Sequence, residues 1–478
     1  MTLLALILVP ALAAAGAYAH REAAYRTGWL VGVAALHLAL VVAVWLAPPA
    51  AVLGGWLAVD ALGLVVLALV SLLFFVVALY TVGYLRREDP RGGRAFVSCL
   101  LAFLASASLV ALSHHFALLW VGMESTTLAV APLIFHRHDR RSLEAVWKYL
   151  VLSSVAIALA LLGTFFLATA QSLVAGAGRP LVLEDLVAAA PRLHVAWLRG
   201  AFIFLLVGFG TKMGLVPLHT WKPDTYGEAP SLVGGLMAGA LASCAFLGLA
   251  RITQVVLAAG LAAFVRPLLI GFGLLSLAAA AAFMILQSDV KRLLAYSSIE
   301  HTGLLVLGLG LGGVGPYGTV LHVINSGLAK VLMFLAVGNV VLATGTSAAA
   351  GNRGILRTLP VSGALLLIGL FAVTGSPPFG PFVSEFTILR AALAEGHPWV
   401  AAGMVALLAI VFVGMAAMIL EMLHGERGSA GAHAPESGWL VVGPAALAAA
   451  ILTLGLYIPA PLQDALVRAA AALGGRAP

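Results

Sequence analysis

Residues 210–221 read GTKMGLVPLHTW and place a lysine and a proline within a mostly apolar segment. The segment begins near Ala201, so Lys212 would lie at membrane depth, with Pro217 five residues after it. A lysine at the bilayer centre costs about 3 kcal/mol on insertion scales, so it needs a partner or a path to water. The proline frees backbone carbonyls that only neighbouring protein or a polar cavity can satisfy. We therefore predict a broken membrane helix with an ion site at the break, the alternative being a kinked helix whose lysine reaches the surface.

The composition of the whole chain is that of a polytopic membrane protein. Of its 478 residues, 62% are hydrophobic and only 9% are charged, whereas a soluble protein carries roughly 25% charged residues. The net charge of +7 comes from basic residues in short loops between apolar spans, so it does not indicate a nucleic-acid partner. The lipid bilayer is the first expected partner of this chain.

No catalytic site is expected within the chain itself. Cys99 and Cys244 both lie in apolar runs and lack the spacing of metal ligands. The sequence has no phosphate-binding glycine loop and no nucleophile beside a base. We therefore expect no cofactor and no metal, and any redox or hydrolytic chemistry would have to come from partner subunits.

Apolar stretches of about 20 residues, the length that crosses a bilayer, recur through the chain and predict about fourteen transmembrane helices. Span seven is the broken helix that begins near Ala201. A surface helix is expected over residues 184–190. The other expected spans are 1–19, 27–48, 56–84, 95–112, 116–135, 147–170, 231–250, 267–287, 292–312, 316–344, 358–395, 398–423 and 437–459.

Spans seven and twelve are both broken by proline, and each has a charge beside the break. Two broken helices in corresponding positions indicate two inverted halves with ion sites at the discontinuities. The predicted organisation is helices 1–3 in residues 1–94, a first half of helices 4–8 in 95–251, a second half of helices 9–13 in 266–424, and a last helix with a tail in 436–478.

The loop charges predict the orientation of the chain. Most loop arginines and lysines follow odd-numbered spans, which places those loops in the cytoplasm and both termini outside. We expect a multi-pass protein of the bacterial cytoplasmic (inner) membrane. The basic residues in these loops include Arg21, Arg86, Arg91, Arg140, Lys222, Arg292, Arg353 and Arg427.

Glu124 and Lys212 form the first predicted charge pair. Glu124 lies in the middle of span five, where an isolated carboxylate would be costly. Paired with Lys212, it could stay ionised and tune how strongly that lysine holds a proton. The alternative is a static structural bridge.

A second set of polar residues lies in spans eleven and twelve. His322 and Lys330 are eight residues apart, a little over two turns, so they share a helix face. With Asn325 and Ser326 nearby, this face could hold a chain of waters, although His322 could instead cap a carbonyl between packed helices. Glu385 follows the second break and is expected to hold protons.

Two further histidines are weaker candidates. His219 and Asp224 lie on the cytoplasmic side of the first break, where protons could be taken up, although Asp224 would more often cap a helix. His301, next to Glu300, lies at the start of the tenth span. Asp60, near the end of a span, is expected to be structural.

Three motifs resemble the antiporter-like proton-channel subunits of respiratory complex I and of Mrp antiporters. They are KMGLVPLHTWKPDTYGEAP at 212–230, SDVKRLLAYSS at 288–298 and FVSEF at 382–386. Within that family, WVGMESTTLA at 120–129 and SLEAVWKYL at 142–150 resemble component F of hydrogenase-4 most, a relative found in membrane-bound formate hydrogenlyase complexes. The resemblance extends over nearly the whole chain.

The resemblance implies roles for matching residues. Glu124 and Lys212 would form an ion pair whose opening couples to neighbouring subunits. Lys330 and Glu385 would be the charged residues of helices eleven and twelve, and His322 would be one of two channel histidines. The position of the second histidine falls on Ser326.

One position departs from the family pattern. Many complex I members have a lysine in helix eight, and the aligned position here is Ser243. The link between the two halves must then use His219, His301, water or another group.

We therefore expect a proton-translocating membrane subunit of a redox-driven complex, a hydrogenase or a complex I-like assembly. Its predicted partners are other membrane subunits and a soluble redox or large cytosolic protein. Alternatives are a Na⁺/H⁺ antiporter subunit of Mrp type, a passive anchor for a soluble enzyme, and a membrane subunit paired with a large soluble protein for bicarbonate accumulation. The predicted proton pathway consists of Glu124, Lys212, His219, His301, His322, Lys330 and Glu385.

Overall fold

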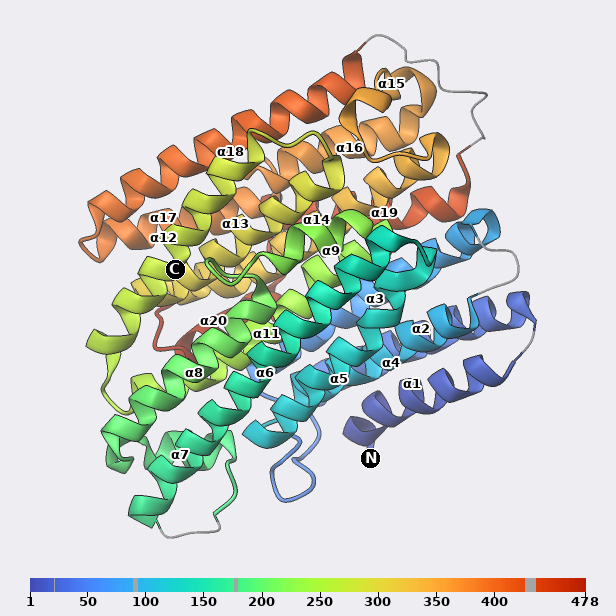
Figure 1. Cartoon of the computed structure of the whole chain (residues 1–478). Helices are drawn as coiled ribbons and strands as arrows, with labels where there is room; N and C mark the ends of the chain where they lie inside the picture. Colours follow the sequence, from blue (N-terminus) through green and yellow to red (C-terminus); the bar gives the residue numbers. More distant parts are fainter. Residues whose placement is uncertain (21, 89–92, 176–178, 426–435) are drawn as a thin grey trace.

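The computed structural model describes residues 1–20, 22–88, 93–175, 179–425 and 436–478 and shows an all-α bundle. Most helices run along a common direction, with α18 (Pro398–His424) at one edge and α1 (Thr2–Ala19) at the opposite edge (Figure 1). Within the described ranges there is no strand, only isolated β-bridges. The predicted fold class is therefore confirmed.

The other helices before the first break are α2 (Ala23–Leu46), α3 (Ala61–Glu88), α4 (Arg94–Leu112), α5 (Phe116–Ile134), α6 (Arg140–Ala175), α7 (Leu183–Ala189) and α8 (Val195–Met213). Those after it are α9 (Trp221–Glu228), α10 (Ser231–Leu236), α11 (Ala242–Ala258), α12 (Ala262–Met284), α13 (Val290–Leu311), α14 (Gly315–Thr344), α15 (Ile355–Thr358), α16 (Pro360–Val373), α17 (Gly380–Ala394), α19 (Gly438–Leu456) and α20 (Ala460–Ala472).

Thirteen helices in the described part of the chain are long and apolar enough to cross a membrane. One of them, Ser231–Ala258, joins α10 and α11 through a π-helical stretch, Met237–Leu241. The remaining expected span is span twelve, 358–395, which the structure divides into the short helices α16 and α17. The span count predicted from hydropathy therefore agrees with the structure.

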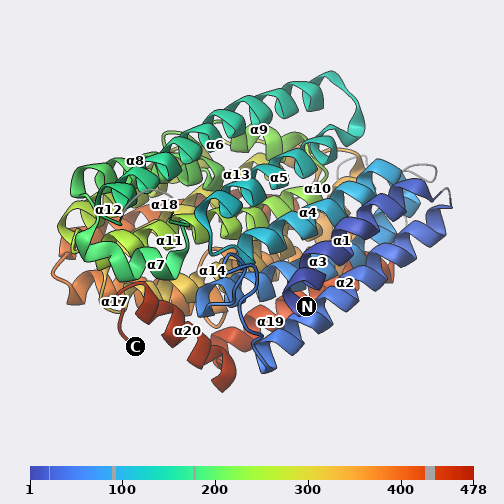
Figure 2. The ribbon, with the colours of Figure 1, turned by 90° about the horizontal axis from the view of Figure 1, so that it is seen from below.

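Several expected boundaries differ from the structure, and α20 (Ala460–Ala472) was not expected. α3 begins at Ala61 and not at residue 56, because the residues before it form a turn in which Gly54 and Gly55 have positive φ. α6 begins at Arg140 and not at residue 147. The additional helix, α20, packs on α3 and α14 and lies with α19 on the side of the bundle away from α6 and α8 (Figure 2). Its buried face is made of small and aliphatic residues.

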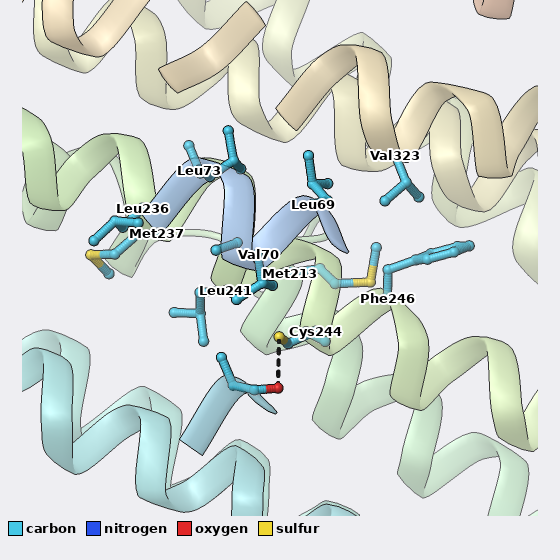
Figure 3. Close-up of a cluster of buried hydrophobic side chains, with 14 of the residues drawn as sticks. Leu69, Val70, Leu73, Met213, Leu236, Met237, Leu241, Cys244, Phe246 and Val323 are labelled. Atoms are coloured by element: carbon cyan, nitrogen blue, oxygen red, sulfur yellow. Dashed lines mark hydrogen bonds between the residues drawn. The ribbon is translucent and has the colours of Figure 1, made fainter. Parts of the chain in front are cut away.

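The centre of the bundle is formed by the two spans with the most enclosed residues. The spans Ser231–Ala258 and Val290–Leu311 are buried along nearly all of their length, whereas α1 and α2 are mostly exposed. Figure 3 shows the apolar packing here, where Met213 of α8 and Cys244 of α11 meet side chains of α3. The Cys244 thiol lies 3.9 Å from the Ala107 carbonyl. Cys244 is thus part of the apolar core.

The first break comes earlier than the proline predicts. α8 ends at Met213, and Gly214 follows with φ +84, a conformation that favours glycine at a helix C-terminus. Pro217 lies in the turn that leads to α9. Lys212 is therefore in the last turn of α8, where the freed carbonyls and the helix dipole favour a cation.

The second break separates α16 from α17 in the segment that contains Pro377 and Pro378. Gly375 has φ +63, and a Cβ atom built on it would overlap the carboxylate of Glu385. A Cβ on Gly380 would likewise approach the side chain of Asn325 to 2.5 Å. The glycines of this break therefore make room for two polar side chains.

A polar cluster joins the loop before α3 to the loop between α4 and α5. Asp60 accepts hydrogen bonds from Arg251 at 3.0 Å and from His114 at 3.1 Å, and His114 also contacts Glu184 of α7 at 2.5 Å. Burial alone would lower the pKa of His114, but its hydrogen bonds to the two carboxylates raise it above the usual value. Asp60 thus holds together Arg251 of α11 and the loop that carries His114.

The orientation prediction uses loop arginines and lysines, and four of them are not found in described loops. Arg21, Arg91 and Arg427 lie outside the described residues. Lys222, assigned to a cytoplasmic loop, is instead a fully buried residue of α9. That assignment is wrong, because the segment after the first break folds back into the bundle. The division into inverted halves and the outside position of both termini stay predictions.

Candidate functional site

The first polar site lies at the end of α8. The Lys212 side chain is 1% exposed, so it does not reach the membrane surface. Its ammonium group donates to the Thr127 hydroxyl at 2.7 Å, and this hydroxyl donates to the Glu124 carboxylate at 3.3 Å. The sequence predicts a direct pair of Glu124 and Lys212, whereas the structure joins the two groups through the hydroxyl of Thr127, on the same helix as Glu124.

Aromatic groups cover the other side of the Lys212 ammonium. Its nitrogen lies 3.4 Å from the Tyr149 hydroxyl and 5.0 Å from the centre of that ring. Tyr149 contacts Trp221, and the Trp221 indole donates to the Thr211 carbonyl at 2.9 Å. The indole is thus a second donor to this carbonyl, which also accepts from the Gly214 N–H at 3.0 Å, and the ring of Tyr149 attracts the desolvated cation.

Glu124 lies toward the rim of the bundle. It is half-buried in α5, and its neighbours Val121 and Leu128 on that helix are exposed. An ionisable group in this position can be reached from a neighbouring chain. The first site is therefore enclosed at Lys212 and accessible at Glu124.

An ion-pair cluster covers the turn after the first break. Asp224 of α9 binds Lys148 of α6 at 2.8 Å and Arg292 of α13 at 2.9 Å, and Lys148 also binds Glu144 at 2.8 Å. The expectation that Asp224 caps a helix is wrong, because its carboxylate joins three helices. Partly exposed pairs of this kind contribute about 0 to 1 kcal/mol each.

His219 lies apart from the other predicted residues. It is half-buried in the turn between α8 and α9, where its Nδ1 atom contacts the Pro217 carbonyl at 3.3 Å. The structure gives it no contact with Lys212. His219 is therefore placed beside the break and outside the polar cluster of the bundle centre.

The second polar site brings together α13, α14 and α17. His301 Nδ1 and His322 Nε2 share a hydrogen bond of 3.0 Å, and His322 Nδ1 lies 2.9 Å from the Ser384 hydroxyl. Ser384 in turn donates to the Pro381 carbonyl at 2.9 Å. With Nδ1–H of His322 directed at Ser384, its Nε2 atom is free to accept a proton from His301.

Glu385 lies against this histidine pair. Ligand atoms of His301, His322 and Glu385 lie within 4.8 Å of one another, and all three side chains are buried. Such a trio could hold a metal ion, but the hydrogen bond between the imidazoles already uses the nitrogens that face each other. The arrangement also forms a short line of groups that can each bind and release a proton.

Lys330 and Glu300 form the second buried pair of opposite charges. Glu300 of α13 and Lys330 of α14 attract each other, and Glu300 also repels Glu385. Glu300 is therefore within electrostatic range of both groups. One carboxylate oxygen of Glu300 and one of Glu385 have no hydrogen-bond partner in the described protein. Buried polar atoms of this kind bind internal water.

Sequence reasoning missed several polar residues of the two sites. Thr127 lies one turn after Glu124, the spacing at which two side chains share a helix face. Glu300 was predicted only as a neighbour of His301 near the start of a span, although it is fully buried in α13. The available signal was the position of Glu300, a third carboxylate within an apolar run after Glu124 and Glu385. Tyr149, Lys222 and Ser384 carried no comparable signal.

The comparisons with known proteins agree on one family. A model of the family "NADH:quinone oxidoreductase/Mrp antiporter, TM" matches residues 113–413. The hydrogenase-4 component F homolog of Methylacidiphilum infernorum is 33% identical over 383 residues, which cover 78% of this chain and 80% of that protein. The NADH-quinone oxidoreductase subunit N of Thiobacillus denitrificans is 30% identical over 362 residues, covering 74% of this chain and 72% of the other.

Solved structures share the fold. A chain of the membrane-bound sulfane sulfur reductase, an archaeal respiratory membrane complex, superposes with a TM-score of 0.90 and 23% sequence identity. The superposition covers 99% of this chain and 98% of that one. At this identity the likeness concerns the fold alone.

Proposed function

The chain belongs to the NADH:quinone oxidoreductase/Mrp antiporter family of membrane subunits, and we propose that it conducts protons through its two helix breaks. It is an antiporter-like membrane subunit of the kind found in hydrogenase and complex I-type assemblies. Other membrane subunits are therefore its partners. A soluble redox protein on the cytoplasmic side is part of our proposal.

One observation carries the proposal. Both breaks place an ionisable side chain in the apolar interior beside other ionisable groups. At the first break Lys212 is linked to Glu124 through one hydroxyl. At the second, Glu385 lies within reach of His301 and His322. Burying such groups is costly, and an intramembrane ionisable residue is a functional site by default.

The proposed pathway has two buried holding sites. A proton taken up on the cytoplasmic side, where His219 lies in our orientation, is held at Lys212. How tightly Lys212 holds it depends on the charge of Glu124, because an opposite charge nearby favours the ammonium form. The proton then reaches Lys330 and the second site and leaves near Glu385.

The second site passes the proton by short steps. Glu300 links Lys330 and Glu385, because its charge attracts Lys330 and repels Glu385. The histidine pair offers a parallel step, because His301 and His322 are already joined by a hydrogen bond. Protonation of Glu385 removes its repulsion with Glu300, and its later release of the proton restores the starting charges.

The position of Glu124 supports coupling to a neighbour. A neighbouring subunit that changes the charge near this half-buried carboxylate would change its attraction for Lys212, as the electrostatic interaction between the two falls steeply with distance and exposure to water. Energy released in a distant redox subunit could then be used to load and release a proton here.

The test is proton flux in proteoliposomes that contain the purified, assembled complex. We expect substrate oxidation to acidify one side, the gradient to collapse with a protonophore, and the flux to be independent of Na⁺. Lys212→Ala should lower the flux by at least about 100-fold with the subunit still assembled, whereas the surface variant Arg353→Ala should leave it unchanged. Flux in Lys212→Ala equal to the parent chain would refute the proposal. Obligatory Na⁺ countertransport would identify a Mrp-type exchanger.

A further inference from the structure

Lys222 is a fully buried lysine that the predicted pathway does not include. It lies in α9, and its ammonium group donates to the Met213 carbonyl at 2.6 Å and lies 3.4 Å from the Ser298 carbonyl. Its stem passes over Gly214, where a Cβ atom would lie 2.5 Å from the lysine Cδ. The glycine that ends α8 therefore also admits this side chain into the bundle.

The two carbonyls place the Lys222 ammonium between the two polar sites. Met213 is the residue after Lys212, and Ser298 lies two residues before Glu300 on α13. The positive charge of Lys330 repels that of Lys222, and both charges act on His301. Lys222 is thus adjacent to the first site through the backbone and within electrostatic range of the second.

Aromatic side chains continue this connection. Lys222 lies 5.7 Å from the centre of the Tyr226 ring. Tyr226 contacts Trp221 on one side and Phe334 of α14 on the other. Trp221 contacts Tyr149, which covers Lys212. The row of rings runs from Lys212 to α14, with the Lys222 ammonium beside its middle.

Polar atoms without a direct partner surround the same place. The hydroxyls of Tyr226 and Ser298 make no direct hydrogen bond in the described protein. The Thr225 and Ser297 hydroxyls and one Glu300 oxygen also lack a partner there. Buried polar groups like these are the ones that ordered water bridges, so this region can carry protons between side chains.

Ser243 of α11 cannot take the role of a proton-carrying group between the two sites. Its hydroxyl donates to the Gly239 carbonyl of its own helix at 2.6 Å. A serine hydroxyl also does not hold an extra proton near neutral pH. A different ionisable group has to connect the two polar sites.

We propose that Lys222 is this group, a proton-carrying residue between Lys212 and the Glu300–Lys330 pair. The inference rests on the proposed function. A proton from Lys212 converts the Lys222 amine to an ammonium ion, which then gives the proton through water to Glu300 and returns to the neutral amine. Repulsion between Lys222 and Lys330 favours charging them one after the other.

The competing explanation is a purely structural lysine that holds α9 against the end of α8. Arginine separates the two explanations, because it keeps the positive charge and the donors for Met213 but cannot lose its proton in a protein. Lys222→Met removes both the donors and the proton site. A second lysine, Ser243→Lys, can then test for rescue.

Ser243 is suitable for that rescue because it lies on the face of α11 that continues from Gly239, which packs near α14. Gly239, one turn earlier, lies between α3 and α14, with its Cβ position 2.7 Å from Leu73, 3.1 Å from Val331 and 3.2 Å from the Gly327 carbonyl. A lysine at 243 would lie along the same face, next to the turn that carries Lys330. It could supply a proton site but could not cap Met213.

The experiment measures proton flux per inserted subunit in proteoliposomes for the parent complex, Lys212→Ala, Lys222→Arg, Lys222→Met and the double variant Lys222→Met with Ser243→Lys. We expect the flux of Lys222→Arg and of Lys222→Met to be at least about tenfold lower than that of the parent complex. The double variant should regain part of this flux. Lys222→Arg with flux near the parent level would overturn the inference.

If Lys222→Arg inserts too poorly to measure, the double variant decides. Flux above that of Lys222→Met supports the inference, and flux at the Lys212→Ala level overturns it. Failure of the proposed function is a separate result, in which the parent complex itself conducts no more than Lys212→Ala.

Discussion

The two helix breaks hold opposite charges at opposite kinds of helix end. At the first, Lys212 lies in the last turn of α8, where the negative end of the helix dipole favours a cation. At the second, Glu385 lies in the second turn of α17, beyond the turn where the dipole acts, and its carboxylate lies against Gly375 of the break. The helix end thus favours the charge at the first break, whereas at the second a glycine makes room for the carboxylate.

The two breaks differ in how far their polar groups are satisfied. Lys212 has a hydroxyl partner at 2.7 Å and an aromatic ring above it, and its distant partner Glu124 is half-buried at the rim. Glu300 and Glu385 are enclosed, and each retains a carboxylate oxygen that has no hydrogen-bond partner among the described residues. The first break is thus built to respond to a neighbour, and the second to pass protons on internally.

The largest expected effect comes from the enclosed site. Glu300→Gln keeps the shape of the side chain but removes the charge opposite Lys330, so proton transfer through the second break should fall by about 100-fold. Proteoliposome flux per assembled subunit measures this. The exposed Glu144→Gln serves as the control and should change flux by less than about twofold. Unchanged flux in Glu300→Gln would remove this residue from the pathway.

A smaller effect is expected from the hydroxyl that bridges the first site. Thr127→Val keeps the shape of the side chain but breaks the connection from Lys212 to Glu124, and hydrogen bonds to charged groups contribute about 1.5 to 3 kcal/mol. We expect flux to fall about tenfold. Thr127→Ser retains the hydroxyl and should keep most of the flux. Equal flux in the valine and serine variants would show that the bridge is not used.

The His114 cluster gives a pH dependence that does not involve either break. Because the folded pKa of His114 is raised, its contribution to stability is fully present below a pH of about 6.5 and is lost as the pH rises through the folded value. The low pKa of Asp60 acts in the opposite direction and only in strong acid. Thermal unfolding of the purified complex should show the parent losing about 1 to 3 kcal/mol relative to His114→Gln on going to alkaline pH. A constant difference between the two would contradict this.

The smallest effect is expected at the ion pairs that cover the first break. Asp224→Asn weakens the contacts to Lys148 and Arg292, which are partly exposed, so the free energy of unfolding should fall by no more than about 1 kcal/mol. Flux should stay within about twofold of the parent. A loss of flux as large as that of Thr127→Val would mean that Asp224 belongs to the proton pathway.

Most of the fold follows from hydropathy and helix length. Apolar runs located nearly every span, because a membrane helix must satisfy its own backbone and cannot be short. Helix ends were less certain, since α8 stops at Gly214 and not at Pro217. A glycine that can adopt positive φ ends a helix as effectively as a proline, and the sequence alone does not show which of the two is used.

The candidate site was predicted only in part for a related reason. Charges at membrane depth, such as Lys212 and Glu385, stand out from their apolar surroundings. Lys222 did not stand out, because it follows the break in a segment that reads as a polar loop. Only the folding of α9 back against α13 shows that this lysine is buried.

The most direct test of a single pathway through both breaks is a comparison of Lys212→Ala, Glu385→Gln and the double variant in one proteoliposome assay of proton flux. If protons pass the two breaks in series, each single variant blocks the flux and the double variant is no worse than the more damaged single one. If each single variant keeps about half of the flux and only the double variant abolishes it, the breaks belong to independent pathways and this account is wrong.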